Sequence, residues 1–102
     1  MQDNDELQAE IDRDEAEKAA MERQAQLLEE AFEKVLGTAE GKRVIWWIMG
    51  ECGVFGLSMT GNSQTFFNEG MRNIGLKLMD RVMQTNPSLY QEMYEQARKD
   101  AQ

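Results

Sequence analysis

Residues 61–76 read GNSQTFFNEGMRNIGL and constrain the fold more than any other stretch of the chain. Asn62 or Ser63 is suited to accept hydrogen bonds from the first free N–H groups of a helix. Apolar residues follow at helical spacing and share one broad face. This stripe consists of Phe66, Phe67, Met71, Ile74, Leu78 and Val82. The pattern predicts a helix over about residues 63–85 with this stripe along one face.

Two glycines lie inside this predicted helix, at Gly70 and Gly75. Each costs about 1 kcal/mol relative to alanine in a helix interior. A helix tolerates that cost where something must come close to its backbone. Glu69 and Arg72 are three residues apart and can pair across one turn. These features indicate a helix that docks against a neighbour, rather than an active site.

The N-terminal third of the chain has no proline or glycine and is rich in helix-forming residues. Its apolar residues step by four and three, the spacing of a coiled-coil seam. The predicted seam of this arm consists of Met21, Ala25, Leu28, Phe32 and Val35. Upstream, Leu7 and Ile11 would continue this seam, but the seam positions between them and Met21 hold the charged residues Asp14 and Lys18. We therefore predict a firm helix over about 20–36 with a left-handed cap at Gly37. Residues 1–20 are expected to form an acidic arm, flexible or ordered only by a partner.

The net charge of −8 belongs to this N-terminal segment. Residues 1–36 carry twelve acidic and four basic residues, whereas residues 37–102 carry seven of each. An acidic segment repels phosphate. We therefore expect no sequence-specific nucleic-acid binding, and only passive proximity to DNA.

Two more helices complete the predicted fold. Thr38 is a suitable N-cap for a helix over about 39–52, which is apolar on all sides and should be buried on most of them. The apolar linker 54–61 should tuck under the domain or into a neighbour. Asn86 and Pro87 suggest the cap and first residue of a last helix, about 87–99. The prediction is an all-α protein, a small bundle of about four helices (21–102) from which the long acidic N-terminal helix extends.

The residue types exclude several kinds of chemistry. With no histidine and one cysteine, the chain can form neither an internal disulfide nor the usual structural zinc sites. Its glycines do not form a phosphate-binding motif, and no nucleophile–base pair is evident. Cys52 has no neighbouring base, so we expect an inert thiol. We expect no enzyme activity, no catalytic residues, no cofactor and no metal.

The start of the chain lacks the features of a signal peptide, and its longest apolar run is far too short to span a bilayer. We therefore expect folding in a reducing cytoplasm.

Without the arm, about 80 residues remain, a size at which isolated cores are marginal. Apolar content on so small a body favours association. Trp46 and Trp47 suit a core or subunit interface better than a membrane surface. The predicted subunit or partner interface consists of Trp46, Trp47, Phe55, Phe66, Phe67, Glu69, Gly70, Arg72 and Asn73.

Three runs of the sequence resemble a family of small virion structural proteins of short-tailed, podovirus-like bacteriophages. They are VLGTAEGKRVIWWIMGECGVF (35–55), GNSQTFFNEGMRNIGLKLMDRV (61–82) and NPSLYQEMYEQA (86–97). The resemblance covers about residues 32–97 and leaves the acidic arm outside. It implies a non-enzymatic virion or virion-assembly protein, made in the host cytoplasm. Together with the charged helical arm and the apolar body, it leads us to expect repeated copies, bound to other virion proteins near the portal, tail or capsid interior.

Two alternatives remain open from the sequence. The protein could be an internal one that is ejected with the DNA and contacts the host envelope, for which Trp46 and Trp47 are the motivation. It could also be a scaffold or packaging adaptor, whose acidic arm engages a basic partner.

Overall fold

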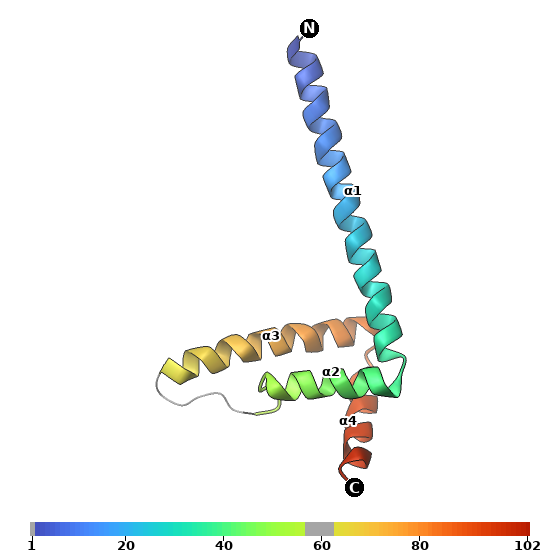
Figure 1. The fold of residues 1–102 in the computed structure, drawn as a ribbon, viewed down its shortest axis with the longest axis vertical. Helices are drawn as coiled ribbons and strands as arrows, with labels where there is room; N and C mark the ends of the chain where they lie inside the picture. The colour runs from blue at the N-terminus through green and yellow to red at the C-terminus, as the bar shows by residue number, and fades with distance from the viewer. Residues whose placement is uncertain (1, 57–62) are drawn as a thin grey trace. The chain divides into compact units, whose positions relative to one another are not determined.

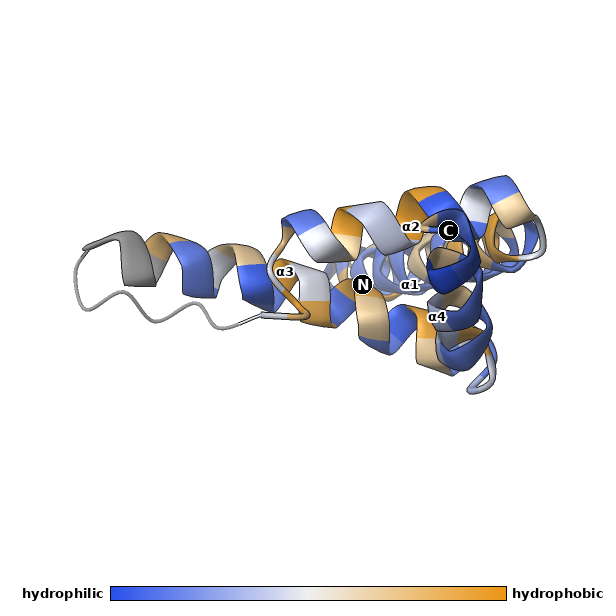
Figure 2. Cartoon of the chain, turned by 90° about the horizontal axis from the view of Figure 1, so that it is seen from below, coloured by the Kyte–Doolittle hydropathy of each residue, from blue (hydrophilic) through white to orange (hydrophobic). Residues whose placement is uncertain are grey.

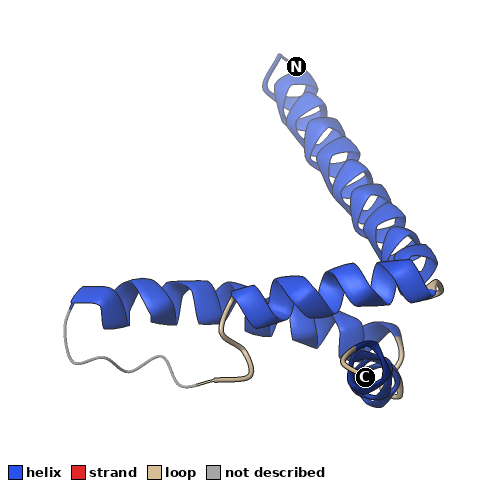
Figure 3. Cartoon of the chain, turned by 60° about the horizontal axis from the view of Figure 1, so that its bottom comes forward, coloured by secondary structure: helices blue, strands red, loops and turns tan. Residues whose placement is uncertain are grey.

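The computed structural model describes residues 2–56 and 63–102, with side chains from 3–56 and 67–102. Its helices are α1 (Gln2–Leu36), α2 (Ala39–Glu51), α3 (Ser63–Thr85) and α4 (Leu89–Asp100) (Figure 1). Helices joined by turns make up these residues, without a strand (Figure 3). The predicted all-α class is therefore confirmed. Asn62 and most of the apolar linker lie outside the described residues.

The chain divides into two compact units, unit 1 (Met1–Ala31) and unit 2 (Phe32–Gln102). Unit 1 is helical from Gln2 onward, so α1 includes the stretch expected to be flexible or ordered only by a partner. That this stretch needs a partner for its order stays a prediction. Nearly all side chains of unit 1 are exposed.

Unit 2 contains the hydrophobic core of the described chain. The end of α1 contributes to it, and α2, α3 and α4 each pack against the other two. Hydrophobic segments alternate with hydrophilic ones along α2 and α3 (Figure 2). The fully buried residues are Leu36, Met49, Val82, Leu89 and Met93. Partly buried residues surround them, namely Phe32, Ile45, Trp46, Val54, Leu78 and Met79. So small a core leaves much of the apolar content of unit 2 at its surface.

The turn between α1 and α2 depends on Thr38. Its hydroxyl oxygen accepts a hydrogen bond from the Gly41 amide at 3.0 Å, which confirms the predicted N-cap. The same hydroxyl donates to the Val35 carbonyl at 3.1 Å. A Cβ on Gly41 would collide with that carbonyl, so this tight turn requires glycine there.

The left-handed cap predicted at Gly37 is wrong. Among the described residues, the positive φ belongs to Gly53, at 78°, just beyond the end of α2. Gly37 instead donates to the Lys34 carbonyl at 3.3 Å, and Thr38 closes the turn on Val35. The side chain of Thr38 thus satisfies a carbonyl at the end of α1 without a left-handed residue.

The predicted start of α4 is also wrong. The helix begins at Leu89, and Asn86 closes a turn before it. The Asn86 side-chain oxygen accepts from the amide of Ser88 at 3.0 Å and from its hydroxyl at 2.9 Å. Asparagine readily bonds the backbone two residues onward, and this competes with its role as a helix cap. Pro87 therefore lies in the turn.

The apolar residues of α2 and α3 are only partly buried within the described chain, so α2 is less buried than predicted. On α2, Trp47 is 63% exposed and Val44 is 54% exposed. On α3, Phe67 is 61% exposed and Ile74 is 64% exposed, although Val82 on the same stripe is fully buried. Helical spacing identifies an apolar face, but it does not tell whether the same chain covers it.

Candidate assembly surface

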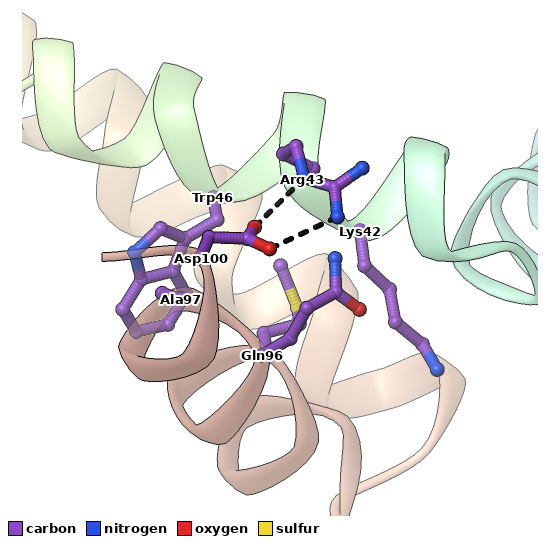
Figure 4. Close-up of a pocket in the computed structure, with 7 residues that line it drawn as sticks. Lys42, Arg43, Trp46, Gln96, Ala97 and Asp100 are labelled. Carbon is purple, nitrogen blue, oxygen red and sulfur yellow. Dashed lines mark hydrogen bonds and ion pairs between the residues drawn. The ribbon is translucent and has the colours of Figure 1, made fainter. Parts of the chain in front are cut away.

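The α2–α4 contact is held by polar bonds between residues far apart in the sequence. The Arg43 guanidinium donates from Nε to the Asp100 carboxylate at 2.7 Å and from an Nη at 3.1 Å (Figure 4). Lys42 pairs with Glu92 at 3.2 Å, and the Gln96 amide donates to the Ala39 carbonyl at 2.8 Å. These bonds fix α4 against the first turns of α2.

The hydrogen bond from Arg43 lowers the pKa of Asp100, and their opposite charges act in the same direction. The same bond and charge raise the pKa of Arg43. The cavity lined by these residues and Trp46 has a volume of only about 20 Å³, room for about one water molecule. This region is therefore a structural contact rather than a ligand site.

Trp46 belongs to an aromatic cluster within unit 2. Its ring stacks on Phe55 with centroids 4.5 Å apart, and Tyr90 and Tyr94 lie at 5.7 and 6.3 Å. Two of the predicted interface residues, Trp46 and Phe55, thus have aromatic partners in their own chain. Trp47, the next residue along α2, is exposed.

The first half of α3 presents a second exposed apolar surface. Phe67 and Ile74 are seven residues apart, so they share one row on the helix. Gly70 lies between them, and a Cβ built on it has no heavy atom within 4 Å. Asn73 is exposed beside this row. We call Phe67, Gly70 and Ile74 the α3 row.

Gly75 differs from Gly70 in its surroundings. A Cβ on Gly75 would lie 2.5 Å from the Val54 Cγ2 atom and 2.6 Å from the Cys52 Cβ atom. The chain after α2 therefore packs directly onto the α3 backbone at Gly75. Among the described residues, the close approach predicted for both glycines occurs at Gly75 and not at Gly70.

Three more predicted interface residues lie on α3. Glu69 is exposed, and Arg72 is half-buried. The Arg72 Nε atom is buried and has no hydrogen-bond partner within the described part of the chain. The side chain of Phe66 lies outside the described residues. That these residues form an interface stays a prediction.

Comparison with known protein families gives a match that covers the greater part of the chain. Residues 32–95 match the family described as Bbp19-like phage protein. The chain belongs to this family of Bbp19-like phage proteins. No curated protein and no solved structure matches it. The family match confirms a phage protein, as the resemblance implied. It begins at the first residue of unit 2 and includes the α3 row.

Unit 1 of this Bbp19-like protein precedes the matched region and carries most of the predicted seam. Met21, Leu28 and Val35 are exposed, the last just beyond unit 1. Phe32, by contrast, packs on the core of unit 2, with the Arg81 guanidinium 5.7 Å from its ring centroid. This stacking was not expected from the sequence, because nothing in the spacing links two residues so far apart.

Other kinds of site receive no support from the described residues. Across residues 2–56 and 63–102, no group of three histidine, cysteine, aspartate or glutamate side chains is placed to hold a metal ion. Within the same ranges, none of the helices is long and apolar enough to cross a membrane. Cys52 is a half-buried thiol that caps the end of α2 through its backbone.

Proposed function

We propose that this Bbp19-like protein is a non-enzymatic structural protein of the virion of a short-tailed phage. It assembles in repeated copies near the portal, the tail or the capsid interior. The observation that carries this proposal is the α3 row, in which an unfilled glycine lies between two exposed apolar side chains.

Gly70 has no explanation within the described part of the chain. It costs about 1 kcal/mol in the helix interior relative to alanine, and no described heavy atom lies within 4 Å of a Cβ built there. A neighbouring subunit packed against the α3 row would fill that space. Burial of Phe67 and Ile74 would contribute about 1.5–3 kcal/mol for each side chain. Self-association through the α3 row therefore explains both the glycine at position 70 and the exposed apolar side chains of Phe67 and Ile74.

Further features of unit 2 support assembly. Trp47 and Val44 provide a separate apolar surface on α2, and large aromatic residues commonly contribute most to an interface. A body with so few buried residues is the kind that association stabilises. In unit 1, the negative charge would let DNA pass nearby without binding. The residues offer no nucleophile–base pair for an enzyme.

Quantitative mass spectrometry of purified phage particles, before and after triggered DNA release, tests this function. We expect the protein in intact particles, in a fixed copy number that DNA release does not change. Loss of the protein together with the DNA would instead favour the ejected-protein function, and absence from mature particles would favour a scaffold or packaging adaptor.

A further inference from the structure

Upstream of Met21, the spacing of the predicted seam continues in unit 1 through the charged residues Asp14 and Lys18. The four–three spacing runs back through the helix to Leu7, and every position on it is exposed. These positions are Leu7, Ile11, Asp14, Lys18, Met21, Ala25 and Leu28. Met21 is 69% exposed and Leu7 is 56% exposed. A single amphipathic helix cannot bury its own seam, so this face needs another element.

The residues on either side of a coiled-coil seam select its partner through their charges. In unit 1 the flanking positions hold five glutamates and two glutamines. They are Gln8, Glu10, Glu15, Glu17, Glu22, Gln24 and Glu29. None of the seven is basic. Arg13 and Arg23 lie on other faces of the helix, and Lys18 is on the seam itself.

These flanks disfavour a second copy of unit 1 as the occupant. In a parallel pair, Glu10 would face Glu15 of the other copy, and Glu17 would face Glu22. In an antiparallel pair, glutamates and glutamines would again face one another. Neither orientation provides an attractive charge pair at the flanking positions, and like charges that face one another there destabilise the pair.

We propose that the seam of unit 1, from Leu7 to Leu28, is a docking surface for an amphipathic helix of a second protein, flanked by lysine and arginine. Basic flanks would pair with all five glutamates, while apolar residues would cover Leu7, Met21 and Leu28. Asp14 and Lys18 fix the register, because a polar interruption of a seam is best met by matched polar groups. Nucleic acid and anionic lipid are excluded as occupants, because the glutamates repel phosphate.

Binding of designed helical peptides to the full-length protein tests this surface. One peptide carries leucine on its seam, with polar residues opposite Asp14 and Lys18, and lysine on its flanks. A second keeps the leucines but has glutamate flanks, and a third keeps the lysines but has a serine seam. Fluorescence anisotropy should show the first peptide binding at least about tenfold more tightly than either control, with an affinity that falls as salt rises. Equal or tighter binding of either control peptide would overturn the proposal.

Two neighbouring glutamates provide a matched pair of variants. Glu29 flanks the seam, whereas Glu30 points away from it. Glu29→Lys should weaken binding of the first peptide about fivefold, because it replaces an attraction by a repulsion, and Glu30→Lys should weaken it less than about twofold. Equal losses would mean attraction by charge alone and would overturn the proposal.

A double variant tests the alternative that a second copy of unit 1 covers the seam. Met21→Ser with Leu28→Ser should abolish peptide binding and leave the oligomeric state of the free protein unchanged in sedimentation velocity. A lower oligomeric state would show that unit 1 pairs with itself, and the proposal would be wrong. All of these variants leave the α3 row intact, so this proposal and the proposed function succeed or fail separately.

Discussion

At the residue scale, Gly70 and Gly75 provide a direct comparison. Gly70→Leu should raise the free energy of unfolding of the isolated protomer by about 0.5–1 kcal/mol, because leucine favours helix and no described heavy atom lies within 4 Å of a Cβ at this position. The same change should abolish self-association by filling the space of the α3 row. Chemical denaturation at low protein concentration measures the first effect, and sedimentation velocity measures the second. An unchanged oligomeric state for Gly70→Leu would count against the α3 row as an interface.

Gly75→Leu is the matched control and should act in the opposite way on folding. Its side chain would meet Val54 and Cys52 at once, and overpacking of this kind costs about 1–3 kcal/mol. The protomer should therefore unfold at a lower denaturant concentration than the wild type. A Gly75→Leu protomer as stable as the wild type would contradict the close packing of α3 on the chain after α2.

At the element scale, the docking of α4 on α2 should depend on pH through Asp100. Its pKa is lowered in the folded chain by the hydrogen bond from Arg43, and by their attraction. A carboxylate whose pKa is lowered on folding stabilises the folded chain at pH values above its pKa in the unfolded chain, about 3.9. That stability is lost as pH falls through the folded value. Asp100→Asn should therefore show a shallower loss of stability than the wild type as pH falls below about 4.

Thermal unfolding followed by circular dichroism over this pH range measures the difference. Asp14→Asn removes one exposed carboxylate of unit 1 and controls for the change in net charge. Its pH profile should stay parallel to that of the wild type. If the pH profile of Asp100→Asn were also parallel to that of the wild type, the Arg43–Asp100 pair would not contribute to the loss of stability in acid.

The elements also show how far sequence reasoning reaches. Local signals predicted α3 and the N-cap of α2, because helical periodicity and the Thr38 cap depend on neighbouring residues. The cap at Gly37 was mispredicted because the Thr38 hydroxyl supplied an equally local alternative. The Arg43–Asp100 pair spans 57 residues, and no local pattern indicates it. The spacing of Phe67, Ile74 and Val82 predicted one apolar face, but not which part of that face unit 2 covers.

At the scale of the whole molecule, most of the negative charge belongs to unit 1 and the hydrophobic core belongs to unit 2. All fully buried residues of the described chain belong to unit 2. Unit 1 contributes eleven acidic and three basic residues and is a lone helix. Since the family match begins where unit 2 begins, the proposed assembly surface and the proposed docking surface belong to different parts of the chain.

A truncated chain of residues 32–102 should therefore fold alone. It keeps every core residue and the end of α1, including Phe32 on Arg81, so its thermal transition should be cooperative and close to that of the full chain. It should retain the oligomeric state of the full chain and lose binding of the basic peptide.

A truncated protein without a cooperative transition would mean that unit 1 contributes to the stability of unit 2. Retained peptide binding would place the basic docking surface outside unit 1, since the truncated chain lacks every seam residue from Leu7 to Leu28.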